Sequence, residues 1–167
     1  MSNVIKAASS FSGTEQPALI GKIYEEQFTD SSGNTMVRYL RCFKADGAVA
    51  AGAVIGAKTS GGLSDLYDSG LAGTMPAVAN TNKQLIAGVA LAAVADGSYG
   101  FCVCQGLVEK VLAGGGTAEG EILMTSGSTA GEVDGDGTIA AGHSNTLIGV
   151  ALSTQTSGTI TAYINVL

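Results

Sequence analysis

The chain carries one β-rich sequence pattern twice, and this repeat constrains its fold more than any single residue does. Residues 85–91 read Leu-Ile-Ala-Gly-Val-Ala-Leu, and residues 147–152 read Leu-Ile-Gly-Val-Ala-Leu. The sequence offset from Gly88 to Gly149 (149 − 88 = 61) is the same as that between the glycines that follow the two segments, Gly97 and Gly158 (158 − 97 = 61). A fixed internal period predicts two copies of one supersecondary unit. Such an architecture disfavours a single buried catalytic centre.

Each unit also has a matching front half. Residues 46–55 resemble residues 114–123, and here Gly52 matches Gly120 at a larger offset (120 − 52 = 68). The first unit therefore has seven extra positions (68 − 61 = 7), which fall within 56–83, where frequent Gly, Ser, Asn and Asp indicate an enlarged surface loop. We therefore divide the chain into an N-terminal arm with the first hairpin strand, 1–35, and a β-barrel domain, 36–167, with repeat units of about 36–104 and 105–167. Units this short bury little core alone, so one shared core is expected.

The apolar pattern predicts an all-β fold: a single β-barrel or β-sandwich built from two similar units, with an extended N-terminal arm. Residues 20–28 and 36–43 flank a Gly-Asn loop and predict a hairpin. Residues 107–113 could form a short helix, but the repeat favours a strand there. The strands expected from residue 36 onward are 36–43, 52–57, 84–94, 98–104, 107–112, 120–125, 146–153 and 158–167, and the last of these alternates apolar and polar residues most clearly.

The repeat also assigns side chains to the two faces of a strand. The offset of 61 places Tyr99, Phe101 and Val103 on the core face. Cys102 and Cys104 then lie on the opposite face, where they match Tyr163 and Asn165.

Composition narrows the class of protein. The 167 residues suit one domain, and a hydrophobic content of 46% argues against disorder. The formal net charge is −6 and Lys and Arg form no cluster, so we expect no nucleic-acid partner. The N-terminus lacks the apolar stretch of a signal peptide, and the longest apolar run is shorter than the ~20 residues that span a bilayer. We therefore expect no membrane partner and synthesis in a cytoplasm, where three cysteines would stay reduced.

Cys102 and Cys104 are the first candidates for a chemical site. Two thiols at this spacing on a strand point the same way and could bind a soft metal ion. A tetrahedral site needs two more ligands, and the other candidates, Cys42 and His143, have no ligand-like spacing. The alternative, which we favour, is that both cysteines are small apolar residues under a partner surface or a loop.

Residues 132–137, Glu-Val-Asp-Gly-Asp-Gly, resemble the start of a calcium loop. Asp134 and Asp136 are the candidate ligands, but His143 stands at the twelfth position in place of a bidentate Glu. The alternative is a β-hairpin turn, because Asp-Gly supplies the positive φ that such turns require. We favour the turn and expect no cofactor, with weak calcium binding by Asp134 and Asp136 left open.

The sequence does not predict an enzyme. His143 is the single histidine, and no Gly-x-Ser-x-Gly elbow accompanies it. The glycine runs at 61–62 and 114–116 lack the Lys-Ser/Thr ending of a phosphate loop. The carboxylates are scattered, and no pair can be placed face to face from the sequence.

The unit pattern resembles that of small phage head-decoration proteins, also called capsid cement proteins. The matching residues are Ala51-Gly52-Ala53-Val54-Ile55 with Gly88-Val89-Ala90-Leu91, and Glu119-Gly120-Glu121-Ile122-Leu123 with Gly149-Val150-Ala151-Leu152. The resemblance covers about residues 36–167. It implies a β-barrel subunit, often a homotrimer, on the virion capsid surface, where it binds across neighbouring major capsid proteins and stabilises the shell. It brings no catalytic residues.

The N-terminal residues 1–19 are the expected capsid-contacting arm, with Val4, Ile5 and Phe11 as apolar anchors. Such an arm could add a strand to an edge of the capsid protein. The alternative for this segment is a disordered tail. The alternative for the whole chain is a carbohydrate- or receptor-binding β-domain of a virion tail or fibre, although sugar sites usually stack the ligand on aromatic rings and this chain has no Trp.

Overall fold

The computed structural model describes residues 12–14, 21–57, 72–74, 86–126, 129–138 and 147–166. These residues form strands and one short 3-10 turn, so the predicted all-β class is confirmed. The candidate arm residues Val4, Ile5 and Phe11 lie outside the described residues, and so does His143. The strands are β1 (Ser12–Gly13), β2 (Ile23–Thr29), β3 (Thr35–Ala45), β4 (Val54–Ala57), β5 (Ala72–Thr74), β6 (Ile86–Ala90), β7 (Tyr99–Leu112), β8 (Ile122–Thr125), β9 (Val133–Gly135), β10 (Leu147–Ala151) and β11 (Thr159–Asn165); the 3-10 turn is η2 (Asp136–Thr138).

The first repeat unit closes into a small ring of strands, which we call the first ring. Its strands pair in the order β3-β5-β4-β6-β7, and β7 pairs back onto β3. The closing strand β5 runs parallel to β3, with Ala45 opposite Gly73. This strand lies in the segment 56–83 that the sequence predicted to be a surface loop, and it is too short and glycine-containing to show a strand period.

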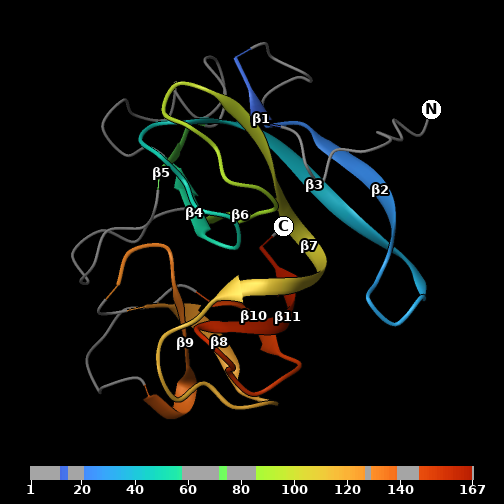
Figure 1. Ribbon diagram of the computed structural model, residues 1–167, viewed down its shortest axis with the longest axis vertical. Helices are drawn as coiled ribbons and strands as arrows, with labels where there is room; N and C mark the ends of the chain where they lie inside the picture. The colour runs from blue at the N-terminus through green and yellow to red at the C-terminus, as the bar shows by residue number, and fades with distance from the viewer. Residues whose placement is uncertain are drawn as a thin grey trace.

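The second repeat unit closes in the same way and forms the second ring. The second half of β7 pairs with β11, and the order continues β11-β10-β8-β9. A parallel bridge between Ala113 and Val133 joins β9 back to the chain just after β7. Figure 1 shows β7 running from the upper ring into the lower one. The predicted strands 98–104 and 107–112 are therefore one continuous strand that belongs to both rings.

The two rings repeat their hydrogen bonds as well as their strands. Gly52 N–H donates to Ala90 O at 2.8 Å, and Gly120 N–H donates to Ala151 O at 2.9 Å. The two donors are 68 residues apart in the sequence (120 − 52 = 68) and the two acceptors are 61 apart (151 − 90 = 61), which are the two offsets of the repeat. The last strand departs from the predicted offset, because Ala90 pairs with Cys102 whereas Ala151 pairs with Ala162.

The predicted match of Cys102 to Tyr163 is therefore wrong by one position. Cys102 corresponds to Ala162, so the offset in this strand is smaller by one than the predicted value (162 − 102 = 60). The first unit has one extra residue, Ser98, between its turn glycine Gly97 and its strand, whereas β11 starts directly after Gly158. One residue changes the face of every later side chain in the strand.

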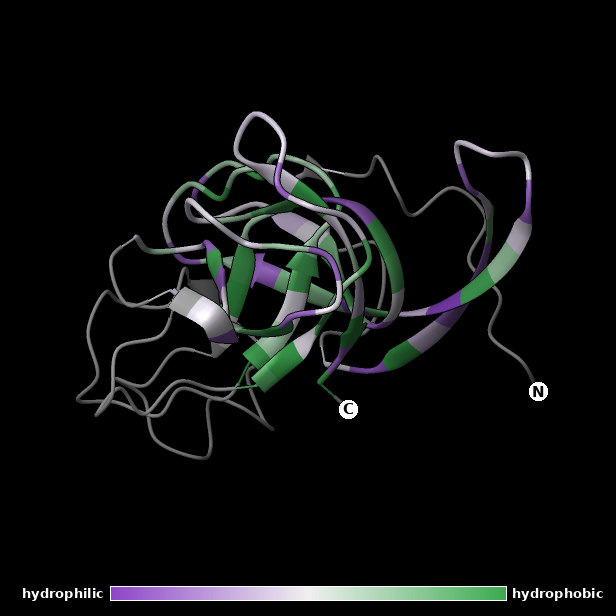
Figure 2. Ribbon diagram, turned by 90° about the horizontal axis from the view of Figure 1, so that it is seen from below, coloured by the Kyte–Doolittle hydropathy of each residue, from purple (hydrophilic) through white to green (hydrophobic). Residues whose placement is uncertain are grey.

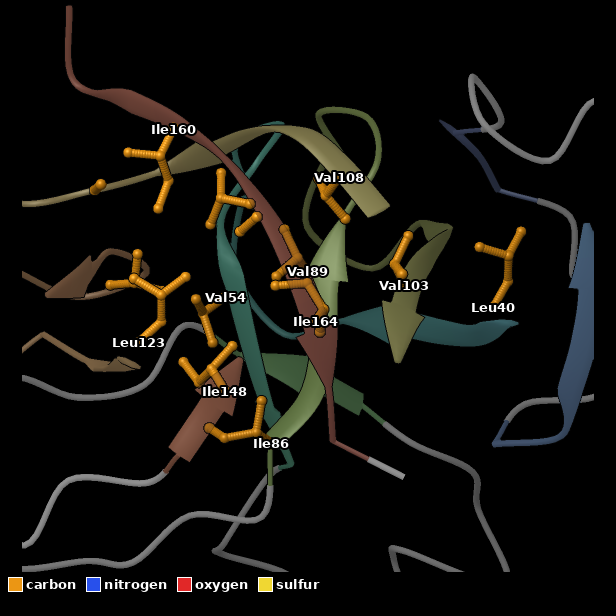
Figure 3. Close-up of a cluster of buried hydrophobic side chains, with 14 of the residues drawn as sticks. Leu40, Val54, Ile86, Val89, Val103, Val108, Leu123, Ile148, Ile160 and Ile164 are labelled. Atoms are coloured by element: carbon orange, nitrogen blue, oxygen red, sulfur yellow. The ribbon is translucent and has the colours of Figure 1, made fainter. Parts of the chain in front are cut away.

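Two clusters of buried side chains form the core. One fills the first ring and contains Phe43, Ala45, Val49, Ala53, Ile55, Ala87, Ala90, Val94 and Cys102. The larger cluster joins the interior of the second ring to the outside of the first: Val54, Val89 and Val103 pack with Leu123, Ile148 and Ile164. Figure 3 shows Val54 beside Leu123 and Ile148. The expected shared core therefore exists, and a second core lies inside the first ring.

Candidate interaction surfaces

A row of four apolar side chains crosses the outer side of the first ring. Leu40 pairs with Val103, Val103 with Val89, and Val89 with Val54. All four side chains are fully buried. The second ring covers this row, and the loop before β9 contributes a backbone contact in which Val54 N–H donates to Gly131 O at 2.8 Å.

The same row recurs on the second ring, but there three of its four side chains are exposed and only Leu107 is buried. Leu107 pairs with Tyr163, Tyr163 with Val150, and Val150 with Ile122. Val150, Ile122 and Tyr163 are 40%, 43% and 42% exposed, whereas their counterparts in the first ring are at 0%. Leu147 at the start of β10 and Leu152 just after its end are 57% and 45% exposed. We call Ile122, Leu147, Val150, Leu152 and Tyr163 the exposed face.

Two glycines shape the strands on which these rows lie. A Cβ atom on Gly88 would meet the backbone oxygen of Val103, and a Cβ atom on Gly149 would meet the backbone oxygen of Tyr163. Strand register shifts beside each glycine, between Ile55 and Gly56 opposite β6 and between Leu147 and Gly149 in β10. The glycines therefore allow close strand approach at the same point of both rings.

The β2–β3 hairpin forms a second exposed surface. It projects from the body of the molecule (Figures 1 and 2), as the sequence predicted a hairpin here. Met36 and Val37 near its end are 36% and 45% exposed. The tip is ordered by Asp30, whose Oδ1 accepts the N–H groups of Ser32 at 3.0 Å and Asn34 at 2.7 Å. The hydrogen bond from the Asn34 side chain, together with those from the backbone of the tip, lowers the pKa of Asp30.

The three cysteines are buried and reduced. Cys102 Sγ lies 3.5 Å from the backbone oxygens of Arg41 and Ala87, and Cys104 Sγ lies 3.2 Å from that of Tyr39. Burial raises the pKa of both Cys102 and Cys104. Within the described residues, no group of three or more His, Cys, Asp and Glu side chains is arranged to hold a metal ion.

The calcium candidates lie on a short strand and the turn after it. Asp134 is in β9, opposite Met124, and its Oδ1 occupies the space beside Gly114 that a Cβ atom would need. Asp136 is in η2, and its Oδ1 accepts the N–H of Ile122 at 3.2 Å. Within the predicted hairpin turn at 132–137, residues 133–135 instead form the ring-closing strand β9, and residues 136–137 lie in the turn η2. Calcium binding by these two carboxylates stays a prediction.

In the part of the chain that the structure describes, no helix has the length and apolarity to cross a membrane. The candidate arm is described only at 12–14, where β1 pairs with β7 (Ser12 with Gly100 and Gly13 with Tyr99). The exposed face was not predicted from the sequence. Both copies of the repeat are apolar at this row, and local periodicity does not show which copy is covered.

No protein-family model and no curated protein matches the sequence. A solved structure does resemble the fold: the crystal structure of the head fiber gp8.5 N base in bacteriophage phi29. The likeness has a TM-score of 0.50 and 18% sequence identity, and it covers 75% of this chain and 92% of that chain. At this identity, the likeness concerns the fold.

Proposed function

We propose that this chain is a structural virion protein that decorates and stabilises a phage capsid by binding across neighbouring major capsid proteins. The observation that carries the proposal is the fold, which is shared with nearly the whole of a phage head fiber base. The sequence resemblance to head-decoration proteins, carried by residues such as Gly52, Gly88 and Gly149, supports the same role independently.

The surfaces of the molecule suit a binding role. Apolar side chains are exposed at two separate places, the exposed face and the end of the β2–β3 hairpin. Exposed apolar patches of this kind are typical of protein–protein contacts. We place the protein on the capsid surface as a homotrimer, with the major capsid protein as its partner and with residues 1–19, including Val4, Ile5 and Phe11, as the contact arm.

Cosedimentation with capsid shells tests this role. Purified full-length protein is mixed with shells assembled from the major capsid protein of the same genome, and bound protein is measured in the pellet. We expect saturable binding at a fixed ratio to the capsid protein and a higher unfolding temperature of the decorated shells. Absence of the protein from the pellet at every salt concentration would overturn the proposal. A variant that lacks residues 1–11 tests the arm, and unchanged affinity would exclude it as a contact.

A second candidate function follows from the same comparison. The similar structure is itself the base of a head fiber, so the chain could serve as a fibre domain that binds a carbohydrate or a receptor. Glycan-array binding together with no retention on shells would favour this second function over capsid decoration.

A further inference from the structure

The outer rows of the two rings consist of similar apolar residues, but the row of the first ring is buried and most of the row of the second ring is exposed to solvent. In the first ring, Val89 sits at the centre of a row that the second ring covers. In the second ring, Val150 sits at the centre of the matching row and is 40% exposed, between Ile122 at 43% and Tyr163 at 42%. The solvent-facing outer side of a repeat unit is normally polar. The outer row of the second ring is apolar instead.

We propose that the exposed face, formed by Ile122, Leu147, Val150, Leu152 and Tyr163, is the surface by which one copy binds the next in the homotrimer, and the inference rests on that part of the proposed function. The structure already contains a contact that this row makes: within one chain, the first ring's row packs against a unit of the same fold. A second copy supplies another such unit. Head-to-tail contacts of this kind close into cyclic oligomers when the rotation between copies allows it.

Net charge limits which surfaces of two copies can meet. The chain carries a formal net charge of −6, so two copies repel each other wherever their acidic surfaces meet. None of the five residues of the exposed face is charged. The exposed face can therefore bury apolar surface in a contact without desolvating a charge of its own.

The area of the exposed face can be compared with the area that a stable interface buries. Five partly exposed side chains offer on the order of 400 Å² of apolar surface, comparable with the largest patch on a typical monomer. A stable interface takes about 800 Å² from each partner. Strand alternation places Met124 on the same side as Ile122 and Thr161 on the same side as Tyr163, and both are half-buried. These flanking residues extend the contact beyond the five.

The mass of the full-length protein in solution, without shells, tests the inference. We expect wild-type protein to be oligomeric in sedimentation velocity and the Val150→Glu variant to be monomeric, because a carboxylate would be buried in the interface. The loss of affinity should be at least about 100-fold. Ile23→Glu is the matched control, since Ile23 is a similarly exposed β-branched residue at the start of β2, outside both apolar surfaces, and the mass of this variant should stay that of wild type.

Thiol labelling gives a second readout that does not depend on a disruptive substitution. The three native cysteines are buried, so Val150→Cys introduces the accessible thiol. Its alkylation should slow as protein concentration rises, whereas a thiol from Ile23→Cys should react at a constant rate. A monomeric wild type, or a Val150→Glu variant with wild-type mass, would overturn the inference. Because no shell is present, this failure is distinct from a failure to bind the capsid.

Discussion

Arg38 and Glu26 form a buried ion pair between the two strands of the projecting hairpin. Arg38 Nε lies 2.7 Å from Glu26 Oε2, and the two side chains are 8% and 4% exposed. The guanidinium of Arg38 also lies over the ring of Phe28, 4.1 Å from its centre. The residues face each other in the strand register, so the pair fixes how β2 lies on β3 where the hairpin leaves the body.

Removing one member of this pair should destabilise the protein more than removing both. Arg38→Met or Glu26→Leu leaves an uncompensated buried charge, and we expect each to lower the free energy of unfolding by about 3–5 kcal/mol. The double variant replaces the pair with apolar side chains and should recover most of that loss. Urea unfolding measures all three. Glu25→Gln on the same strand is the control, with an expected change within about 0.5 kcal/mol. A double variant that loses as much as the two single variants combined would contradict the coupling.

Val89 and Val150 hold the same place in the repeat, so matched substitutions separate folding from assembly. Val89→Ala leaves a cavity in the shared core and should cost about 2–3 kcal/mol of stability at any protein concentration. Val150→Ala at an exposed position should cost under about 0.5 kcal/mol when measured in dilute, dissociated protein. Thermal unfolding at two concentrations checks both. Equal losses at the two positions would show that the second row is buried within a single chain.

Gly88 and Gly149 should tolerate alanine much less well than Gly97. At the first two positions a Cβ atom would collide with the backbone oxygen of a paired strand, at Val103 and Tyr163. We expect losses of at least about 4 kcal/mol, near the limit of single-substitution effects. Gly97 has a positive φ of 73° and open space around its Cα, so Gly97→Ala should cost only about 1–2 kcal/mol. Urea unfolding measures the stability of the three variants, and equal losses in all three would contradict this prediction.

The sequence predicted the strands of both units because their apolar periods are long enough to read. The segments around Gly88 and Gly149, found by their spacing, are β6 and β10, and the two units use the same backbone hydrogen bonds. The short strands β5 and β9, which close the rings, were missed. Three residues show no period, and in both strands the composition is typical of a turn.

The sequence could not assign the faces or the exposed row. A single extra residue, Ser98, moves Cys102 from the predicted match with Tyr163 to a match with Ala162. Burial of the first row and exposure of the second depend on which ring packs on which, and both copies of the repeat carry suitable apolar residues for either outcome. Long-range packing of this kind leaves no trace in local periodicity.

The buried thiols provide the pH-dependent prediction. Burial raises the pKa of Cys102 above its ordinary value of 9.0, so the folded protein keeps this proton after the unfolded chain has lost it. The stability that this group contributes is full below pH 9 and falls as pH rises from there toward the folded pKa. The expected slope is up to about 1.4 kcal/mol per pH unit.

Other groups titrate in the same range, so the measurement needs a variant that lacks this thiol. The Cys102→Ala variant should be less stable than wild type at neutral pH, because the Cys102 side chain helps to fill the core of the first ring. The stability of this variant should, however, fall less steeply than that of wild type between pH 9 and pH 11. In the same pH range, native Cys102 should resist alkylation until urea unfolds the protein, since the thiolate is the reactive form. Parallel slopes for wild type and variant, or rapid alkylation of the folded protein, would show that Cys102 ionises without unfolding.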